Sequence, residues 1–225
     1  FTSAAVAILI NKGKIKGWDD KVKDYLPNYK ASDKYAQNNM TIKDLLSMRS
    51  GYSSRGWDNM LFHGSHYSMD EIINKSQYIP FDLKFRDRMR YDNINYMIVG
   101  KIIEVVSGMA WHDFIKKEIF DKLKMNNSGS TYEFAINNKN TSSPHMYING
   151  NICKIKWRNI DNAAPAGSIV SNIDDMIKWV LFQLSDGIIN NDILVNKDDM
   201  KKMHTPHTII DRELFLTRII DDVFI

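Results

Sequence analysis

Cysteine and long hydrophobic runs are both scarce in this chain of 225 residues. The single cysteine, Cys153, excludes an intramolecular disulfide and a metal centre built from several thiolates, but it leaves the cellular compartment open. The longest apolar stretch, from Ala4 to Ile10, is far shorter than the roughly 20 residues that a membrane-spanning helix needs. These residues are therefore predicted to form a globular structure without a membrane span.

A strong excess of charge of one sign is also missing. The chain carries 30 Lys and Arg and 27 Asp and Glu, which gives a formal net charge of +3 at pH 7, and the two signs are interspersed. Nothing in this distribution predicts binding to a nucleic acid or to a membrane surface. The composition, 44% hydrophobic and 25% charged, excludes a disordered or collagen-like chain and is sufficient for one sizeable core or two small ones.

Residues 2–12 predict a buried core helix, because they are apolar on nearly every face and stop at Gly13, which suits a left-handed helix C-terminus. Neither a methionine nor a capping residue precedes this helix, so we expect the chain to be truncated at its front. Trp18-Asp19-Asp20 predicts the start of a short second helix, which ends at Leu26-Pro27.

A capping box predicts the next helix start. Thr41 is followed three residues later by Asp44, and Met40 and Leu45 are placed as a hydrophobic staple. Gly51 is the expected end, which gives a helix of about two or three turns.

Four further helices are predicted where apolar residues recur with the 3.6-residue period. A second capping box, Ser68-Met69-Asp70-Glu71, opens one of them, and Asn172 with Asp175 opens another, which Gly187 ends. The remaining two meet at Gly108. The apolar positions of the four are Ile72, Ile73 and Ile79; Ile94, Met97, Ile98, Ile102, Val105 and Val106; Trp111, Phe114, Ile115, Ile119 and Leu123; and Met176, Ile177, Val180 and Leu184.

Strand signals are thin. Met146-Tyr147-Ile148 and the residues from Ile152 to Trp157 predict one hairpin, joined across Asn149-Gly150-Asn151. The chain shows no internal repeat and no clear linker, so we expect a mostly helical structure.

Tyr91-Asp92-Asn93 places a phenol and a carboxamide two positions apart, immediately before an amphipathic helix. Side chains at i and i+2 point the same way along an extended backbone, so Tyr91 and Asn93 can face one pocket, and we expect Asp92 to point outward. A phenol can pass a proton, and an amide can hold a substrate carbonyl. The same three residues are also compatible with a tyrosine packed beside an asparagine helix cap.

Three groups of residues, taken in their order and spacing, carry a family resemblance. They are Leu45-Leu46-Ser47-Met48-Arg49-Ser50-Gly51; Tyr91-Asp92-Asn93 with Tyr96 and Gly100; and Ala164-Pro165-Ala166-Gly167-Ser168-Ile169 with Ser171 and Asp175-Met176. From Phe1 to Pro206 the chain resembles the penicillin-binding-protein-like serine hydrolases. The closest likeness is to the beta-lactamase-related group, which includes class C beta-lactamases, D-Ala-D-Ala peptidases and related esterases.

The resemblance implies the α+β beta-lactamase/transpeptidase-like fold, whose antiparallel sheet is built from strands near the two ends of the domain. Residues 1–225 would then form a single incomplete catalytic domain that keeps mainly the helical part and lacks most of the sheet. The family also implies a periplasmic or secreted location, with any signal peptide lost in the truncation.

The family's chemistry implies roles for individual residues. A serine nucleophile and its lysine base lie on one helix face in the motif S-x-x-K, while Y-x-N supplies a proton-relay tyrosine and a substrate-orienting asparagine. Tyr91 and Asn93 match the second motif and are the candidate catalytic residues. S-x-x-K does not occur in the 225 residues and is expected just upstream of Phe1. The third family element, K-T-G or H-x-G, is expected after Thr205-Pro206.

Two positions depart from the family pattern. The family often has His where this chain has Met48, and Ser where it has Asp92. A carboxylate beside the relay tyrosine would raise the tyrosine pKa if it faced inward, so the direction of Asp92 bears on activity.

Metal and cofactor binding are not predicted. His63-Gly64-Ser65-His66 and His204-Thr205-Pro206-His207 each hold two imidazoles three positions apart, but the glycine and the proline disfavour the helical geometry that would bring both rings to one zinc ion. We expect a small amide or ester as the substrate and no nucleic-acid partner, while the sequence does not indicate the oligomeric state.

Two functions remain open at this point. The first is a serine hydrolase, of which this chain is a piece, acting through an acyl-enzyme. The second is a non-catalytic remnant or binding protein that keeps the fold without the nucleophile. The residues encoded just upstream of Phe1 discriminate between them, because S-x-x-K there supports the enzyme and an authentic start codon supports the remnant.

Overall fold

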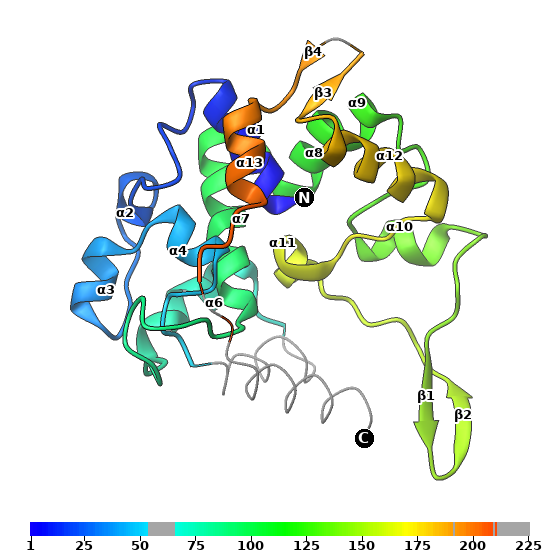
Figure 1. Ribbon diagram of the computed structural model, residues 1–225. Coiled ribbons are helices and arrows are strands. Elements are labelled where there is room, and N and C mark those ends of the chain that lie inside the picture. The colour runs from blue at the N-terminus through cyan, green and yellow to red at the C-terminus, as the bar shows by residue number, and fades with distance from the viewer. Residues whose placement is uncertain (54–65, 191, 209, 211–225) are drawn as a thin grey trace.

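Helices α1 and α7 run through the middle of the protein, and the other helices surround them (Figure 1). The computed structural model describes residues 1–53, 66–190, 192–208 and 210. Its α-helices are α1 (Thr2–Asn11), α2 (Val22–Tyr25), α3 (Lys34–Asn39), α4 (Ile42–Leu46), α6 (Met69–Lys75), α7 (Asn93–Ser107), α8 (Trp111–Ile115), α9 (Asp121–Leu123), α10 (Tyr132–Asn137), α11 (Ala164–Gly167), α12 (Ile173–Leu184) and α13 (Lys197–Met203).

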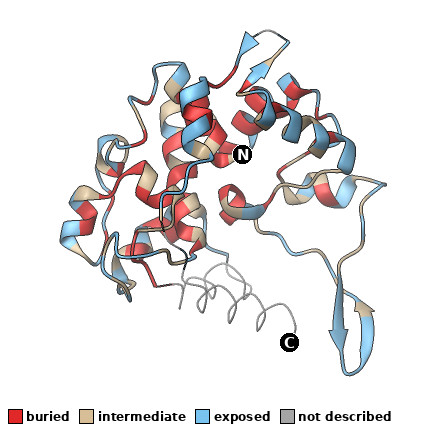
Figure 2. Ribbon diagram, viewed as in Figure 1, coloured by how far each residue is buried: buried red, intermediate tan, exposed pale blue. Residues whose placement is uncertain are grey.

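Helix α1 is the core helix that the sequence predicts. Val6 and Ile8 are completely buried, and the helix contacts α7, α8 and α13, as the buried segment beside the N-terminus in Figure 2 shows. Each fully buried aliphatic side chain of this kind contributes about 1.5–3 kcal/mol. The helix ends as expected, because the chain turns at Gly13 with φ +66°.

Helix α7 begins and ends where its sequence signals lie. The Asp92 side chain accepts a hydrogen bond from the Ile94 amide, and Gly108 adopts φ +71° at the C-terminus. Buried residues occupy most of the helix, and Val106 still packs against the core in the last turn, but the predicted core position Val105 is exposed.

Helix α4 confirms its capping box but is shorter than predicted. The Thr41 and Asp44 side chains exchange hydrogen bonds with each other's backbone amides at 3.2 and 3.0 Å. The helix ends at Leu46 rather than near Gly51. Met48 takes a left-handed conformation with φ +54°, which stops the helix one turn early and turns the chain toward residues 86–90.

Helix α2 starts later than the sequence indicated. Asp20 does not lie inside a helix, because its carboxylate accepts hydrogen bonds from the Lys16 and Gly17 amides and from the Tyr25 hydroxyl. The carboxylate thus closes a turn, and the helix begins at Val22.

The remaining helical predictions are confirmed with small changes. Ser68 caps α6 through a capping box with Glu71. A 3-10 turn, Ser76–Tyr78, follows α6, so Ile79 lies beyond the helix. The segment after Gly108 divides into α8, a π-helical turn (Lys116–Phe120) and α9, and a second 3-10 turn (Asp161–Ala163) precedes α11.

Two small antiparallel hairpins supply the strands of the described residues. The predicted hairpin is β1 (His145–Ile148) with β2 (Asn151–Lys154), and Tyr147 is paired with Ile152. The second strand ends at Lys154 rather than at the predicted Trp157. Its connecting residues Asn149 and Gly150 both have positive φ, as a two-residue type I′ turn requires. The hairpin projects from the body (Figure 1). The second hairpin, β3 (Ile188–Ile189) with β4 (Asp192–Ile193), was not predicted, because two-residue strands leave no periodic pattern.

Helix α12 carries three of its four predicted apolar residues on an exposed face, while Met176 packs against the core. Asn172 caps the helix by accepting from the Asp175 amide, as expected. Phe182 and Asp175 are buried on the inner side. The exposed apolar residues are Ile173, Ile177, Val180, Leu181 and Leu184. Regular spacing identified the helix but not which face is covered. Among the described helices, none has the length and apolarity to cross a membrane.

Candidate active site

Tyr91 and Asn93 lie together at the entrance to α7. The Tyr91 hydroxyl donates a hydrogen bond of 3.2 Å to the Asn93 Oδ1. Asn93 is the first residue of the helix, while Tyr91 precedes the cap and leaves 54% of its surface exposed. The two side chains therefore point the same way, as the i, i+2 spacing predicts, and both can be reached from solvent.

Asp92 points inward, which corrects the prediction that it faces outward. Only 2% of the residue is exposed, and its Oδ1 accepts from the Ile94 amide at 3.0 Å as the N-cap of α7. The Asn95 side chain donates to the Asp92 carbonyl at 3.2 Å. Capping requires the carboxylate to fold back over the first turn, and in α7 this side of the turn faces the interior.

Tyr96 connects this segment to α4 and to the start of α1. Its hydroxyl donates to the Leu46 carbonyl at 3.2 Å. Burial raises the pKa of the Tyr96 phenol, a hydrogen bond with Ser3 opposes the rise, and the Tyr91 phenol adds to it. Tyr96 is therefore a common neighbour of Tyr91 and of the first turn of α1.

The first turn of α1 is held from a second side by α11 and α12. The Thr2 hydroxyl donates to the Pro165 carbonyl at 2.7 Å. The Phe1 ring stacks on Trp179 with centroids 3.9 Å apart and meets Phe120 edge-on at 5.8 Å. Phe1 and Thr2 are therefore held by α11, α12 and the π-helical turn that contains Phe120.

A pocket of about 440 Å³ opens beside this region. Ser3, Leu46 and Tyr96 line one part of it. Its other lining residues are Gly17, Trp18, Asp19, Asp20, Lys43, Ser47, Lys202, Met203 and His207. Tyr91 and Asn93 do not belong to this lining, whereas Tyr96, a neighbour of Tyr91, does.

The Ser171 and Asp175 part of the third motif has a structural role. The buried Asp175 carboxylate accepts from the Asn127 amide and the Ser128 hydroxyl, both at 2.8 Å, and pairs with Lys178 at 2.7 Å. Ser128 also bonds to Ser171 at 2.8 Å. Burial raises the pKa of Asp175, but these partners outweigh burial and keep the pKa low. The carboxylate fastens α12 to the 125–131 loop.

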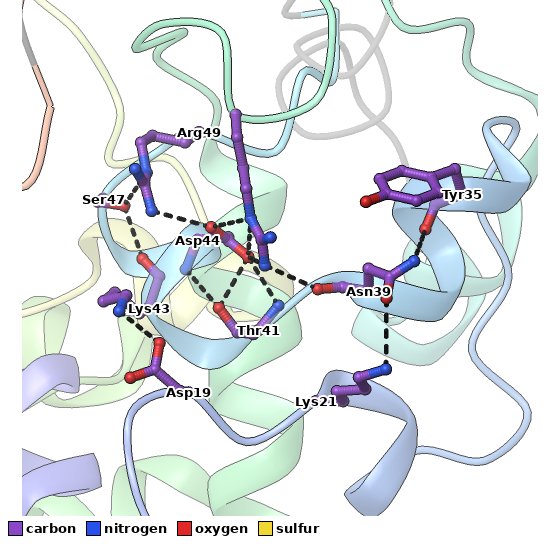
Figure 3. A network of polar contacts seen from close by, with 10 residues as sticks. Asp19, Lys21, Tyr35, Asn39, Thr41, Lys43, Asp44, Ser47 and Arg49 are labelled. Carbon is purple, nitrogen blue, oxygen red and sulfur yellow. Dashed lines mark hydrogen bonds and ion pairs between the residues drawn. The ribbon is translucent and has the colours of Figure 1, made fainter.

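A second buried carboxylate holds the segment in front of Tyr91. Asp44 is 0% exposed and accepts hydrogen bonds from Thr41 and Arg49 (Figure 3). It also accepts from Arg86. Thr41, Asp44, Arg49 and Arg86 are called the Asp44 cluster below. The Asp44–Arg86 contact in this cluster joins α4 to Arg86, which lies five positions before Tyr91.

His204 and His207, the two histidines of the second predicted pair, have separate partners. His204 bonds through Nε2 to the Gln183 Oε1 at 3.0 Å, and the His207 Nε2 bonds to the Lys202 carbonyl at 2.7 Å. Across residues 1–53, 66–190, 192–208 and 210, three or more His, Cys, Asp or Glu side chains do not gather in a metal-binding arrangement. His63 lies outside the described residues.

Comparison with known proteins adds the family. A sequence profile described as beta-lactamase matches residues 1–211. The chain belongs to the beta-lactamase family. It is 25% identical over 198 residues to penicillin-binding protein 4 of Amycolatopsis lactamdurans, covering 84% of this chain and 49% of that protein.

Solved structures confirm the beta-lactamase/transpeptidase-like fold. The octameric penicillin-binding protein homologue from Pyrococcus abyssi has a TM-score of 0.76 and 25% identity, covering 91% of this chain and 46% of that one. A D-stereospecific amidohydrolase from Streptomyces sp. has a TM-score of 0.78 and 20% identity, covering 94% and 64%. This chain spans between 35% and 49% of the length of the first curated relatives that it matches. Its mostly helical content agrees with a partial domain of this family.

Sequence reasoning also missed two buried polar networks of this beta-lactamase-family structure. The first is the Asp44 cluster, because Arg86 lies 42 residues from Asp44 and no local pattern connects them. The second is a buried chain of hydroxyls, in which Tyr52 bonds to Tyr29 at 2.8 Å and to Ser76 at 3.3 Å. The capping box was a signal for Asp44, but it accounts for only part of what this carboxylate binds.

Proposed function

We propose that the chain is part of a serine hydrolase that forms an acyl-enzyme on a serine outside these 225 residues. Tyr91 relays a proton and Asn93 orients the substrate in this reaction. The observation that carries the proposal is the Tyr91–Asn93 hydrogen bond at the entrance to α7, with Tyr96 joining this segment to the first turn of α1.

The bond between the two side chains suits both roles. Because the Asn93 Oδ1 accepts from Tyr91, its Nδ2 group is the one that can donate to a substrate carbonyl oxygen. The lysine of S-x-x-K takes the proton that the serine hydroxyl loses as the acyl–oxygen bond forms. The Tyr91 phenol, being accessible, can give its own proton to the leaving nitrogen or oxygen as the scissile bond breaks, and the phenolate so formed recovers a proton from that lysine.

The substrate class follows from this chemistry. Acyl transfer to serine consumes an amide or an ester, and the curated relative from Amycolatopsis lactamdurans is named a penicillin-binding protein. A small amide or ester is therefore the proposed substrate. Neither a metal nor a cofactor is needed for these steps.

The test uses the full-length natural protein that contains this chain. We expect a fluorescent penicillin or a fluorophosphonate to label a single serine upstream of Phe1, and a chromogenic cephalosporin or a short-chain p-nitrophenyl ester to be turned over. Tyr91→Phe is expected to lower kcat by about 10²-fold or more. Tyr78→Phe is the matched control, because Tyr78 is a highly exposed tyrosine in the turn after α6.

Three outcomes would contradict the proposal. Absence of both labelling and turnover would support a non-catalytic protein that keeps the fold. A Tyr91→Phe variant as active as its parent would remove Tyr91 from the mechanism. Turnover by the purified 225-residue chain, which contains no S-x-x-K, would show that another nucleophile acts.

A further inference from the structure

The Asp44–Arg86 contact is the most extensively bonded ion pair of the described residues near Tyr91. The Arg86 Nε lies 2.9 and 3.0 Å from the two Asp44 carboxylate oxygens, and its Nη2 lies 2.7 Å from Oδ2. The same Nη2 donates to the Asn39 carbonyl at 3.0 Å. A guanidinium that meets a carboxylate through two nitrogens is fixed in direction as well as in distance.

Burial and two further hydrogen-bond donors fix the Asp44 carboxylate in place. The carboxylate is fully buried and also accepts from the Arg49 Nη2 at 3.0 Å and the Thr41 hydroxyl at 2.7 Å (Figure 3). Burial raises the pKa of Asp44, but the bonds from Arg86 and Thr41 outweigh burial and lower it. A buried carboxylate that stays charged needs its partners in place, so the cluster resists displacement of Arg86.

The backbone around Arg86 follows the loop after α4. The Arg86 amide donates to the Arg49 carbonyl at 2.9 Å, and the Arg90 amide donates to the Met48 carbonyl at 2.8 Å. Arg86 has φ +65°, a left-handed conformation that is uncommon for a residue other than glycine. The side-chain contact with Asp44 gives a physical reason for an arginine at this position, because it offsets the cost of that conformation.

Tyr91 lies at the surface of the protein. It is 54% exposed, so its ring is not held by burial in the core. Its position depends on the Asp92 cap that follows it and on residues 86–90 that precede it. Arg90 also pairs with Asp82 at 2.7 Å. This ion pair lies within the segment before Tyr91 and does not connect that segment to α4.

We propose that Arg86, held by the buried Asp44, is a positioning residue that sets where Tyr91 stands relative to α1 and Asn93. This inference rests on the proposed function for its catalytic consequence. Arg86 touches no reacting group in this scheme and acts through residues 86–90 only.

The first experiment measures position without any activity. Amide hydrogen exchange is followed in the 225-residue chain with Arg86→Ala, Arg86→Lys and, as the matched control, Arg88→Ala. Arg88 lies in the same segment but pairs with the neighbouring Asp87. Exchange at residues 87–91 is expected to rise about tenfold or more in Arg86→Ala, less in Arg86→Lys, and little in Arg88→Ala. These substitutions leave the Arg49 and Thr41 donors to Asp44 unchanged in sequence. Exchange in the buried helix α1 is measured in the same samples and reports whether the fold is kept.

The second experiment is a double-mutant cycle in the full-length natural protein. Arg86→Ala is expected to lower kcat by about 10- to 100-fold with a smaller change in KM, because a displaced relay group slows the chemical step. In a Tyr91→Phe background the same substitution should have little further effect, since Arg86 acts through Tyr91. A merely structural role would lower activity equally in both backgrounds.

The outcomes separate this inference from the proposed function. Unchanged exchange at residues 87–91, or additive losses in the cycle, would overturn the positioning role of Arg86. If Tyr91→Phe is as active as its parent, the proposed function fails, and the exchange measurement still decides whether Arg86 holds the segment.

Discussion

Pro165 of α11 packs directly against the backbone of Gly100 in α7. A Cβ atom placed on Gly100 would lie 2.1 Å from the Pro165 Cγ and 2.6 Å from its Cβ, which is closer than atoms can approach. The contact matters for the site, because the Pro165 carbonyl also accepts the Thr2 hydroxyl of α1. Helices α1, α7 and α11 therefore meet at Thr2, Gly100 and Pro165.

Gly100→Ala should separate α7 from α11. We expect a loss of about 1–3 kcal/mol in the free energy of unfolding, measured by urea denaturation, because the added methyl group forces the helices apart. Gly17→Ala is the control, since a Cβ there meets nothing within 4 Å, and its effect should stay within about 0.5 kcal/mol. Equal stability of the two variants would mean that α11 shifts to make room for the added methyl group without a loss of stability.

Replacing the cap of α7 should affect both stability and the site. Asp92→Ala removes the acceptor for the Ile94 amide and is expected to cost about 1 kcal/mol. Asn172→Ala removes the corresponding cap of α12 and should cost a similar amount. In the full-length natural protein only Asp92→Ala should also lower kcat, because Asp92 lies between Tyr91 and Asn93. Equal losses of activity in the two variants would assign the effect to helix stability alone.

Local signals predicted most of the helices of this fold. The capping boxes at Thr41 and Ser68 and the glycines at 13 and 108 act within a few residues, so the sequence contains all of their partners. The early end of α4 could not be predicted, because the chain leaves the helix to bond with residues 86–90, which are distant in sequence.

The candidate site was predictable in part for the same reason. The i, i+2 spacing correctly indicates that Tyr91 and Asn93 point together and that Asp92 points the other way. The spacing does not indicate which of the two sides faces solvent. The other side of this turn is the interior, where the Asp92 charge contributes to raising the pKa of Tyr52, so the outward prediction was wrong. The pairing of Asp44 with Arg86 likewise depends on tertiary structure that no local pattern encodes.

Removing one hydroxyl from the buried chain should be costly. Tyr52 bonds to Tyr29 and Ser76, and burial raises its pKa to about 12. Tyr52→Phe leaves two buried hydroxyls with one partner fewer, so we expect a loss of about 1–3 kcal/mol in the free energy of unfolding. Tyr35→Phe, at an exposed tyrosine, is the control and should be near neutral. A near-neutral Tyr52→Phe would indicate that Tyr29 and Ser76 readily bond to each other instead.

Acid should destabilise the protein through its two buried carboxylates. The pKa values of Asp44 and Asp175 are both lower in the folded protein than their ordinary value. A group with a depressed folded pKa stabilises the fold above its unfolded pKa, and this stability is lost as the pH falls through the folded pKa. The free energy of unfolding should therefore decline below about pH 4, the ordinary range for aspartate.

Asn substitutions identify the carboxylate responsible. Asp44→Asn and Asp175→Asn should each be less stable than the parent at pH 7 and should lose less stability between pH 5 and pH 3, because neither side chain can then be protonated. Asp198→Asn, at an exposed position in α13, should follow the parent curve. Parallel curves for all four proteins, measured by urea denaturation at each pH, would show that other groups cause the acid sensitivity.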